Sequence, residues 1–153
     1  MSLPKPEPGL VIRYAYLWLR EHREGREEGS KDRPCAIVLA AADRDGETRV
    51  LVVPVTHSPP ENAATALELP QAVKKHLGLD DERSWVVLSE SNLFDWPGPD
   101  LRRVGDRDNS SVAYGFLPPK FFAELRRRFL ALEEPPRARA AFRAASEIPG
   151  GYV

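Results

Sequence analysis

The feature that most constrains the fold is a pair of apolar segments separated by a short polar turn. Residues 35–42 form a continuous apolar run behind a proline, and residues 48–55 form a second run made mostly of valine and leucine. Between them, Asp45-Gly46 is a dipeptide typical of tight hairpin turns. An uninterrupted apolar run of this length is typical of a strand that is buried on both faces. The sequence therefore predicts a buried β-hairpin at the centre of the fold.

Shorter segments on either side of the hairpin predict further strands. Branched and aromatic residues favour strands over residues 10–19, 84–88 and 112–117. A short strand is also expected over residues 66–69, and residues 92–99 are predicted to form a loop or a bulged strand. Residues 20–30 contain two glycines and too few apolar side chains to bury a face, so we expect an exposed loop there. Residues 1–8 are rich in proline, and we expect them to be disordered.

Two helices are predicted in the second half of the chain. Pro70 suits a first helical position, so a short helix is expected over residues 71–77, ending at Gly78. A longer amphipathic helix follows Pro118-Pro119, with apolar side chains at helical spacing and Arg126-Arg127-Arg128 on the solvated face. Its apolar residues are Phe121, Phe122, Leu125, Phe129 and Leu132.

These elements together predict a mainly β fold with α. We expect an SH3-like small barrel of five to seven short strands with a C-terminal amphipathic helix, formed by residues 9–134. A tail over residues 135–153 is expected to contain a short helix rich in alanine and arginine. A length of 153 residues suits one domain of this kind.

Composition narrows the classes of function. The net charge of −1 gives no overall positive field, so contact with nucleic acid would need a local basic patch. The apolar run over residues 14–19 is far shorter than the roughly 20 residues of a membrane span, and no secretory signal pattern is visible. We therefore predict a cytoplasmic protein with no membrane partner. Cys35 is the single cysteine, and its apolar surroundings predict a buried, inert thiol.

The histidines do not predict a metal site. His22, His57 and His76 are isolated in the sequence, with no second ligand at the spacing that metal sites use. The chain also lacks a glycine-rich phosphate loop and a nucleophile-elbow motif. We therefore expect no metal and no cofactor.

Three polar clusters flank the predicted strands. They are Glu28, Lys31 and Arg33 before the first hairpin strand, Thr56-His57-Ser58 after the second, and Ser89-Glu90-Ser91-Asn92 after a later strand. Strand ends in a small barrel can meet on one rim. An arginine can bind a phosphate through paired hydrogen bonds, a hydroxyl can hold another oxygen, and a carboxylate or imidazole can move a proton. Such a set suits cleavage of RNA without a metal, in which the 2′-hydroxyl attacks the adjacent phosphate.

The order of these motifs resembles the MazF/PemK family, the mRNA endoribonuclease toxins of type II toxin–antitoxin systems. The resemblance spans about residues 9–132 and rests most on Arg33-Pro34 before an apolar strand and on Pro54-Val55-Thr56 at the end of the next. It rests further on Gly9-Leu10-Val11, on Ser84-Trp85-Val86-Val87-Leu88-Ser89-Glu90, and on Tyr114-Gly115-Phe116-Leu117 before a helix. The resemblance implies an SH3-like barrel, a homodimer, metal-independent cleavage of single-stranded mRNA that arrests growth, and a cognate antitoxin that covers the RNA groove.

The resemblance also implies roles for individual residues. Arg33 and Thr56 match the positions that hold the phosphate, and Glu90 matches a later acidic position suited to proton transfer. His57 is added to this catalytic set because it follows Thr56 and an imidazole titrates near neutral pH. The RNA-binding candidates are Glu28, which lies near an acidic position of the family loop, Lys31, Ser58, Asn92, and Trp96 as a stacking surface for a base.

The chain departs from the family at several places. Leu88 stands where some members have an arginine, residues 92–99 replace a basic segment, and residues 70–79 resemble an insertion. Two other functions therefore stay open: a non-catalytic SH3-like module that binds nucleic acid or protein, and a toxin that poisons a topoisomerase through its C-terminal helix and tail. Arg33 could instead pair with Glu27, Glu28 or Asp32, and Thr56 could instead bond to the backbone of its turn.

Overall fold

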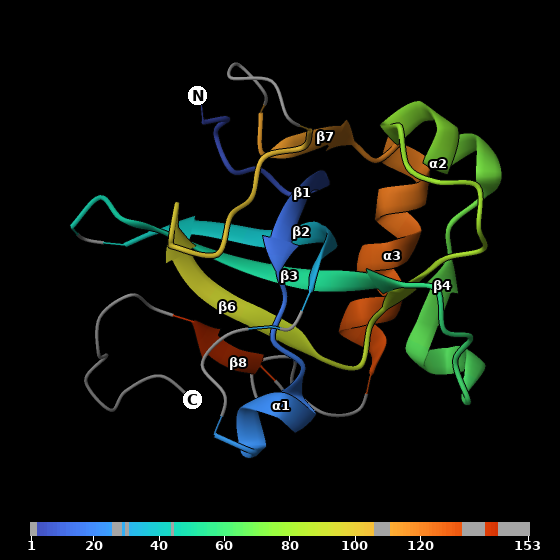
Figure 1. Cartoon of the computed structure of the whole chain (residues 1–153), viewed down its shortest axis with the longest axis horizontal. Helices are drawn as coiled ribbons and strands as arrows, with labels where there is room; N and C mark the ends of the chain where they lie inside the picture. Colours follow the sequence, from blue (N-terminus) through green and yellow to red (C-terminus); the bar gives the residue numbers. More distant parts are fainter. Residues whose placement is uncertain are drawn as a thin grey trace.

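The computed structural model describes residues 3–25, 29, 31–43, 45–105 and 111–132, together with the backbone of residues 140–143 (Figure 1). The strands in these residues are β1 (Leu10–Ala15), β2 (Asp32–Ala42), β3 (Thr48–Thr56), β4 (Ala66–Glu68), β5 (Trp85–Val87), β6 (Ser91–Trp96), β7 (Ala113–Phe116) and β8 (Ala140–Arg143). The helices are α1 (Leu19–Arg23), α2 (Gln71–Leu77) and α3 (Pro119–Ala131), with a 3₁₀ turn, η1, at Ala63–Thr65.

The strands form one sheet built around the predicted hairpin of β2 and β3. Along the main path the order is β4-β5-β3-β2-β1-β7, and neighbouring strands on this path are antiparallel. One edge of the long strand β3 pairs with two different strands. Residues 48–52 pair with β6, whereas Val55 and Thr56 pair with β5. The mainly β class is confirmed. In the described residues the path runs from β4 to β7, and no pairing joins its two ends into a closed barrel.

Both faces of the central strands are buried, which explains the continuous apolar runs. On β2, Ala36 packs in a core cluster beneath the helices, whereas Cys35 and Ile37 pack in a second cluster on the opposite face. The same alternation holds on β3 for Val52 and Val53. Cys35 is fully buried, as predicted, and burial raises the pKa of its thiol well above the ordinary value.

The two predicted helices are present at their expected places. Figure 1 shows α3 behind the sheet and α2 beside it, and the buried apolar residues of both belong to one core cluster. Helix α2 ends at Gly78, whose φ of 72° is the left-handed conformation that favours glycine at a helix end. On α3, Glu124 forms ion pairs with Arg127 and Arg128 of the predicted arginine run.

Four predicted elements differ from the structure. The first strand ends at Ala15 rather than at residue 19, and the predicted loop over residues 20–30 contains most of α1. Just beyond the strand, the Asn92 side chain of β6 holds both the backbone N–H and the carbonyl oxygen of Leu17. Residues 91–96 form a regular strand, β6, not a loop or a bulged strand. Where a short helix was predicted in the tail, residues 140–143 form β8, which is parallel to β6.

The structure describes only part of each end of the chain. Residues 3–8 contain no helix or strand, and most of the tail over residues 135–153 lies outside the described residues. In the part of the chain that is described, no helix has the length and apolar character needed to cross a membrane.

Candidate functional site

Arg33 and Thr56 lie at neighbouring ends of the central hairpin. The register of β2 and β3 pairs Cys35 with Pro54, so the start of β2 lies beside the end of β3. Arg33 reaches the end of β3, because its Nη1 atom donates a hydrogen bond of 3.2 Å to the carbonyl oxygen of Val55, the residue before Thr56. The hairpin therefore brings together two of the predicted catalytic residues from distant positions in the sequence.

The Arg33 guanidinium keeps hydrogen-bonding capacity inside the protein. Its Nε atom is buried and has no hydrogen-bond partner in the part of the chain that the structure describes. Its Cζ atom lies 5.1 Å from the centre of the Trp18 ring, a cation–π arrangement that leaves the N–H groups free to donate in the guanidinium plane. Within the described residues no carboxylate pairs with Arg33, and Asp32 lies instead 3.6 Å from both Arg13 and Arg102. The alternative pairing of Arg33 with Asp32 is therefore wrong, while Glu27 and Glu28 lie outside the described residues.

The Thr56 hydroxyl makes the local hydrogen bond that was considered as its alternative role. Its Oγ1 atom accepts a hydrogen bond of 3.1 Å from the Ser58 backbone N–H. The hydroxyl hydrogen is still available to donate, because the bond to Ser58 uses only an oxygen lone pair. Thr56 can therefore shape its turn and hold an anionic oxygen at the same time.

Glu90 lies between β5 and β6 and is fixed by two donors. Its Oε1 atom accepts hydrogen bonds from the Tyr16 hydroxyl at 3.1 Å and from the Leu19 backbone N–H at 2.8 Å. Burial raises the pKa of this carboxyl above its ordinary value, and the two hydrogen bonds only partly offset that effect. A carboxyl with a raised pKa exchanges protons more readily near neutral pH, as a general acid or base must.

Arg33, Thr56 and Glu90 line one cavity of about 420 Å³, together with Trp18, Arg20 and Ser58. A second cavity of about 360 Å³ is also lined by Arg33 and Thr56, and Lys31, His57 and Asp80 are among its other lining residues. Because Arg33 and Thr56 line both cavities, an anion bound to them would lie between the cavity of Glu90 and the cavity of His57.

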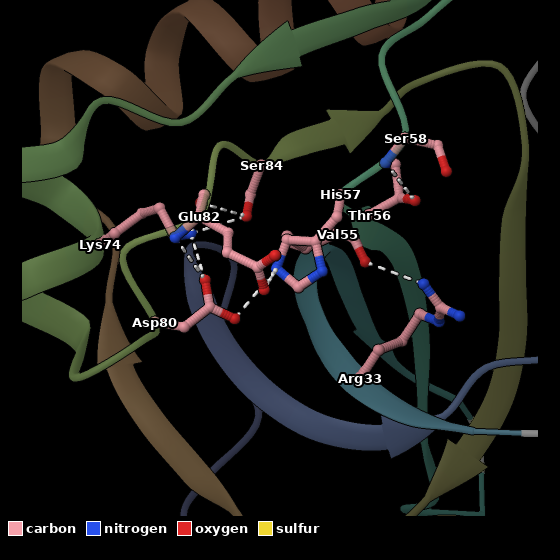
Figure 2. Close-up of polar contacts among 9 residues, drawn as sticks. All are labelled: Arg33, Val55, Thr56, His57, Ser58, Lys74, Asp80, Glu82 and Ser84. Atoms are coloured by element: carbon pink, nitrogen blue, oxygen red, sulfur yellow. Dashed lines mark hydrogen bonds and ion pairs between the residues drawn. The ribbon is translucent and has the colours of Figure 1, made fainter.

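The structure corrects the view of His57 as an isolated histidine. Its Nε2 atom lies 2.9 Å from Asp80 Oδ2 and 3.7 Å from Glu82 Oε2. Figure 2 shows Asp80 between His57 and Lys74, whose Nζ atom lies 2.6 Å from Asp80 Oδ1. No local pattern signals this contact, because Asp80 follows His57 by 23 residues.

The same three acidic and histidine side chains are the described residues best placed to hold a metal. Ligand atoms of His57, Asp80 and Glu82 lie within 4.8 Å of one another, and all three side chains are exposed. The ammonium group of Lys74 already occupies the other oxygen of Asp80. Ion pairing among these groups accounts for the cluster, so it is not assigned to a metal.

The predicted RNA-binding residues are not all at this site. Ser58 lines the cavity of Glu90 and Lys31 lines the cavity of His57, whereas Glu28 lies outside the described residues. Asn92 is fully buried, so it has no surface for RNA. Trp96 lies at the far end of β6, where it packs against Phe94 with ring centres 6.1 Å apart. Neither Asn92 nor Trp96 is part of the cavity that contains Arg33 and Glu90.

Three residues to which the sequence assigned no role are important for the site: Trp18, Gly29 and Asp80. Trp18 lies against Arg33 and directly follows the Leu17 peptide, which Asn92 holds in place. Gly29 packs on the same segment, because a Cβ atom on it would lie 2.7 Å from the Tyr16 carbonyl carbon. Asp80 is the partner of His57. All three roles depend on contacts between distant segments, so no local signal could have revealed them.

No family model matches the chain, and no curated protein matches its sequence.

Proposed function

We propose that this protein is an endoribonuclease that cleaves single-stranded RNA without a metal. The observation that carries the proposal is the cavity lined by Arg33, Thr56 and Glu90, together with the buried Arg33 Nε atom, which has no hydrogen-bond partner among the described residues. A buried, unsatisfied guanidinium donor is costly unless a ligand approaches it. A phosphate diester offers the charge and the oxygens that this group can use.

The residues supply the components that the reaction needs. The guanidinium of Arg33 and the hydroxyl of Thr56 hold the phosphate oxygens and stabilise the charge that develops on them. The RNA 2′-oxygen then attacks phosphorus, forming the O2′–P bond while the P–O5′ bond breaks. One group removes the 2′-hydroxyl proton and another protonates the leaving 5′-oxygen. Glu90 and His57 are titratable groups in the two cavities that share Arg33.

The resemblance to MazF/PemK toxins suggests what the proposed activity would do in the cell. We propose an SH3-like barrel that acts as a homodimer in the cytoplasm, cuts mRNA and arrests growth until a cognate antitoxin binds. The antitoxin would cover the cavity of Arg33, because blocking the phosphate site is the direct way to stop the reaction. Expression of the chain alone should then slow growth, and Arg33→Ala should relieve that effect.

The test of the proposed activity is incubation of the purified protein with a long single-stranded RNA in EDTA. We expect cleavage, and we expect Arg33→Ala to lower its rate by about 100-fold or more, since it removes the main stabilisation of developing charge. Arg83→Ala is a matched control, because the Arg83 Cζ atom also lies over a tryptophan, 5.0 Å from the Trp85 ring centre, outside both cavities. An Arg33→Ala protein that cuts RNA as fast as the parent would refute the assignment of the site.

A second candidate function is RNA binding without cleavage. Leu88 favours it, because this residue is 1% exposed and belongs to the hydrophobic core, at a position where some members of the family have an arginine. A binding module of this kind would retain RNA in a filter-binding assay and leave it intact. Arg33→Ala would then weaken retention, whereas Arg83→Ala would leave it unchanged.

A further inference from the structure

A buried lysine lies beside the cavity of His57. Lys74 is 1% exposed, although it is a charged residue on the short helix α2. Its ammonium group donates to three acceptors: Asp80 Oδ1 at 2.6 Å, Ser84 Oγ at 2.7 Å and the Glu82 carbonyl oxygen. Three acceptors satisfy all three N–H groups of a protonated lysine. Lys74 is therefore a fixed positive charge beneath the surface.

This charge stabilises the ionised form of Asp80. The hydrogen bond from Lys74 holds the pKa of the Asp80 carboxyl below its ordinary value, and His57 lowers it further. Asp80 is therefore ionised at neutral pH and can only accept hydrogen bonds. Since its Oδ2 atom lies 2.9 Å from His57 Nε2, that nitrogen must carry the hydrogen of the contact. The Nδ1 atom of a neutral His57 then keeps its lone pair.

We propose that Asp80, held by Lys74, is a positioning residue that fixes the tautomer of His57 and makes Nδ1 of His57 the general base of RNA cleavage. The inference rests on the proposed endoribonuclease function and assigns its proton transfers. His57 Nδ1 accepts the 2′-hydroxyl proton as the O2′–P bond forms. Glu90, in its protonated form, gives a proton to the 5′-oxygen as the P–O5′ bond breaks. One proton is taken and one is given, so the step is balanced without a co-reactant.

The placement of the two cavities supports this assignment. In-line displacement needs the base and the acid on opposite sides of the phosphorus atom. Glu90 lines one cavity and His57 the other, and Arg33 and Thr56 are shared by both. Figure 2 shows the polar chain that runs from Lys74 through Asp80 to His57 and, separately, the contact of Arg33 with the Val55 carbonyl. Among the described residues, the other charged groups near His57 are Glu82, at 3.7 Å from Nε2, and Lys31 and Asp32, which line the same cavity.

The decisive substitution is Asp80→Asn. The amide oxygen of the new side chain is expected to stay on the ammonium of Lys74, which turns the amide NH₂ toward His57 Nε2. His57 would then carry its hydrogen on Nδ1, the nitrogen that must be free to act as the base. Glu82→Gln is the matched control, because it makes the same change on the neighbouring carboxylate while leaving the Glu82 backbone carbonyl on Lys74.

The experiment combines a spectrum with kinetics on the full chain. Long-range ¹H–¹⁵N spectra, recorded at a pH where the two ring nitrogens of His57 show the neutral imidazole, should show its Nε2–H tautomer in the parent and in Glu82→Gln. In Asp80→Asn they should show the Nδ1–H tautomer. Asp80→Asn should lower kcat for RNA cleavage by about 10-fold or more with little change in KM, and should cause no further loss in a His57→Ala background. Glu82→Gln should retain the parent kcat. The spectra and the melting temperature show whether each variant is folded.

The outcomes separate this inference from the proposed function. If the parent cuts RNA and Arg33→Ala does not, while Asp80→Asn and His57→Ala cut at the parent rate, the role of Asp80 is refuted and the endoribonuclease stands. An unchanged tautomer in folded Asp80→Asn also refutes that role. If the parent leaves RNA intact in EDTA, the endoribonuclease itself is refuted, and the proton-transfer role of His57 falls with it.

Discussion

Asn92→Ala should destabilise the protein far more than a typical asparagine substitution. The Asn92 side chain is fully buried and holds both polar groups of the Leu17 residue, at 2.9 Å from the nitrogen and 2.7 Å from the oxygen. Leu17 is itself 1% exposed, so alanine at position 92 would leave a donor and an acceptor without partners or water. Each buried unsatisfied group costs about 1 to 3 kcal/mol, so the free energy of unfolding should fall by about 2 to 6 kcal/mol.

Urea denaturation of the parent and of two asparagine variants measures this effect. The matched control is Asn62→Ala, because Asn62 is exposed and its side chain accepts one hydrogen bond, from Ala64 N–H at 2.9 Å. Loss of such an exposed cap should cost about 1 kcal/mol. If Asn92→Ala lowers the free energy of unfolding no more than Asn62→Ala does, the interpretation of Asn92 as the clamp of Leu17 is refuted.

Two further predictions concern titratable groups. Glu90→Gln should abolish cleavage yet keep its hydrogen bonds from Tyr16 and Leu19. Because burial raises the pKa of folded Glu90, the stability of the parent relative to this variant should be highest below about pH 4.3 and should fall as the pH rises through the folded pKa. Thermal denaturation of both proteins at about pH 4 and about pH 7.5 checks this. A difference in melting temperature between parent and variant that is the same at both pH values would contradict it. Cys35 is buried with a raised pKa, so a thiol reagent should label it only in denaturant, and fast labelling of the native protein would contradict this.

The elements that the sequence predicted well are those determined by local patterns. Asp45-Gly46 and the apolar runs around it predicted the hairpin because turn chemistry and burial on both faces leave direct signals in a sequence. The amphipathic spacing of α3 was equally direct. The hairpin in turn explains why Arg33 and Thr56 could be paired in advance, since the start of its first strand must lie beside the end of its second.

The parts that could not be predicted depend on contacts between distant segments. The stretch that contains Asn92 was predicted to be a loop or a bulged strand, yet β6 pairs regularly with β3 and the Asn92 side chain turns inward to Leu17. His57 looked isolated because Asp80 reaches it only after α2 and the turn that follows have folded back. No local pattern records such a contact, so its chemistry became visible only in three dimensions.

The most direct test of the proposed reaction is the chemistry of the RNA ends that the parent protein produces in EDTA. Attack by the 2′-hydroxyl must leave a 2′,3′-cyclic phosphate on one product and a free 5′-hydroxyl on the other. We predict that the 5′-hydroxyl products accept phosphate from a polynucleotide kinase without prior phosphatase treatment, and that Arg33→Ala yields about 100-fold fewer such ends. Products that carry a 5′-phosphate would contradict this mechanism, because water rather than the 2′-oxygen would then have attacked the phosphorus.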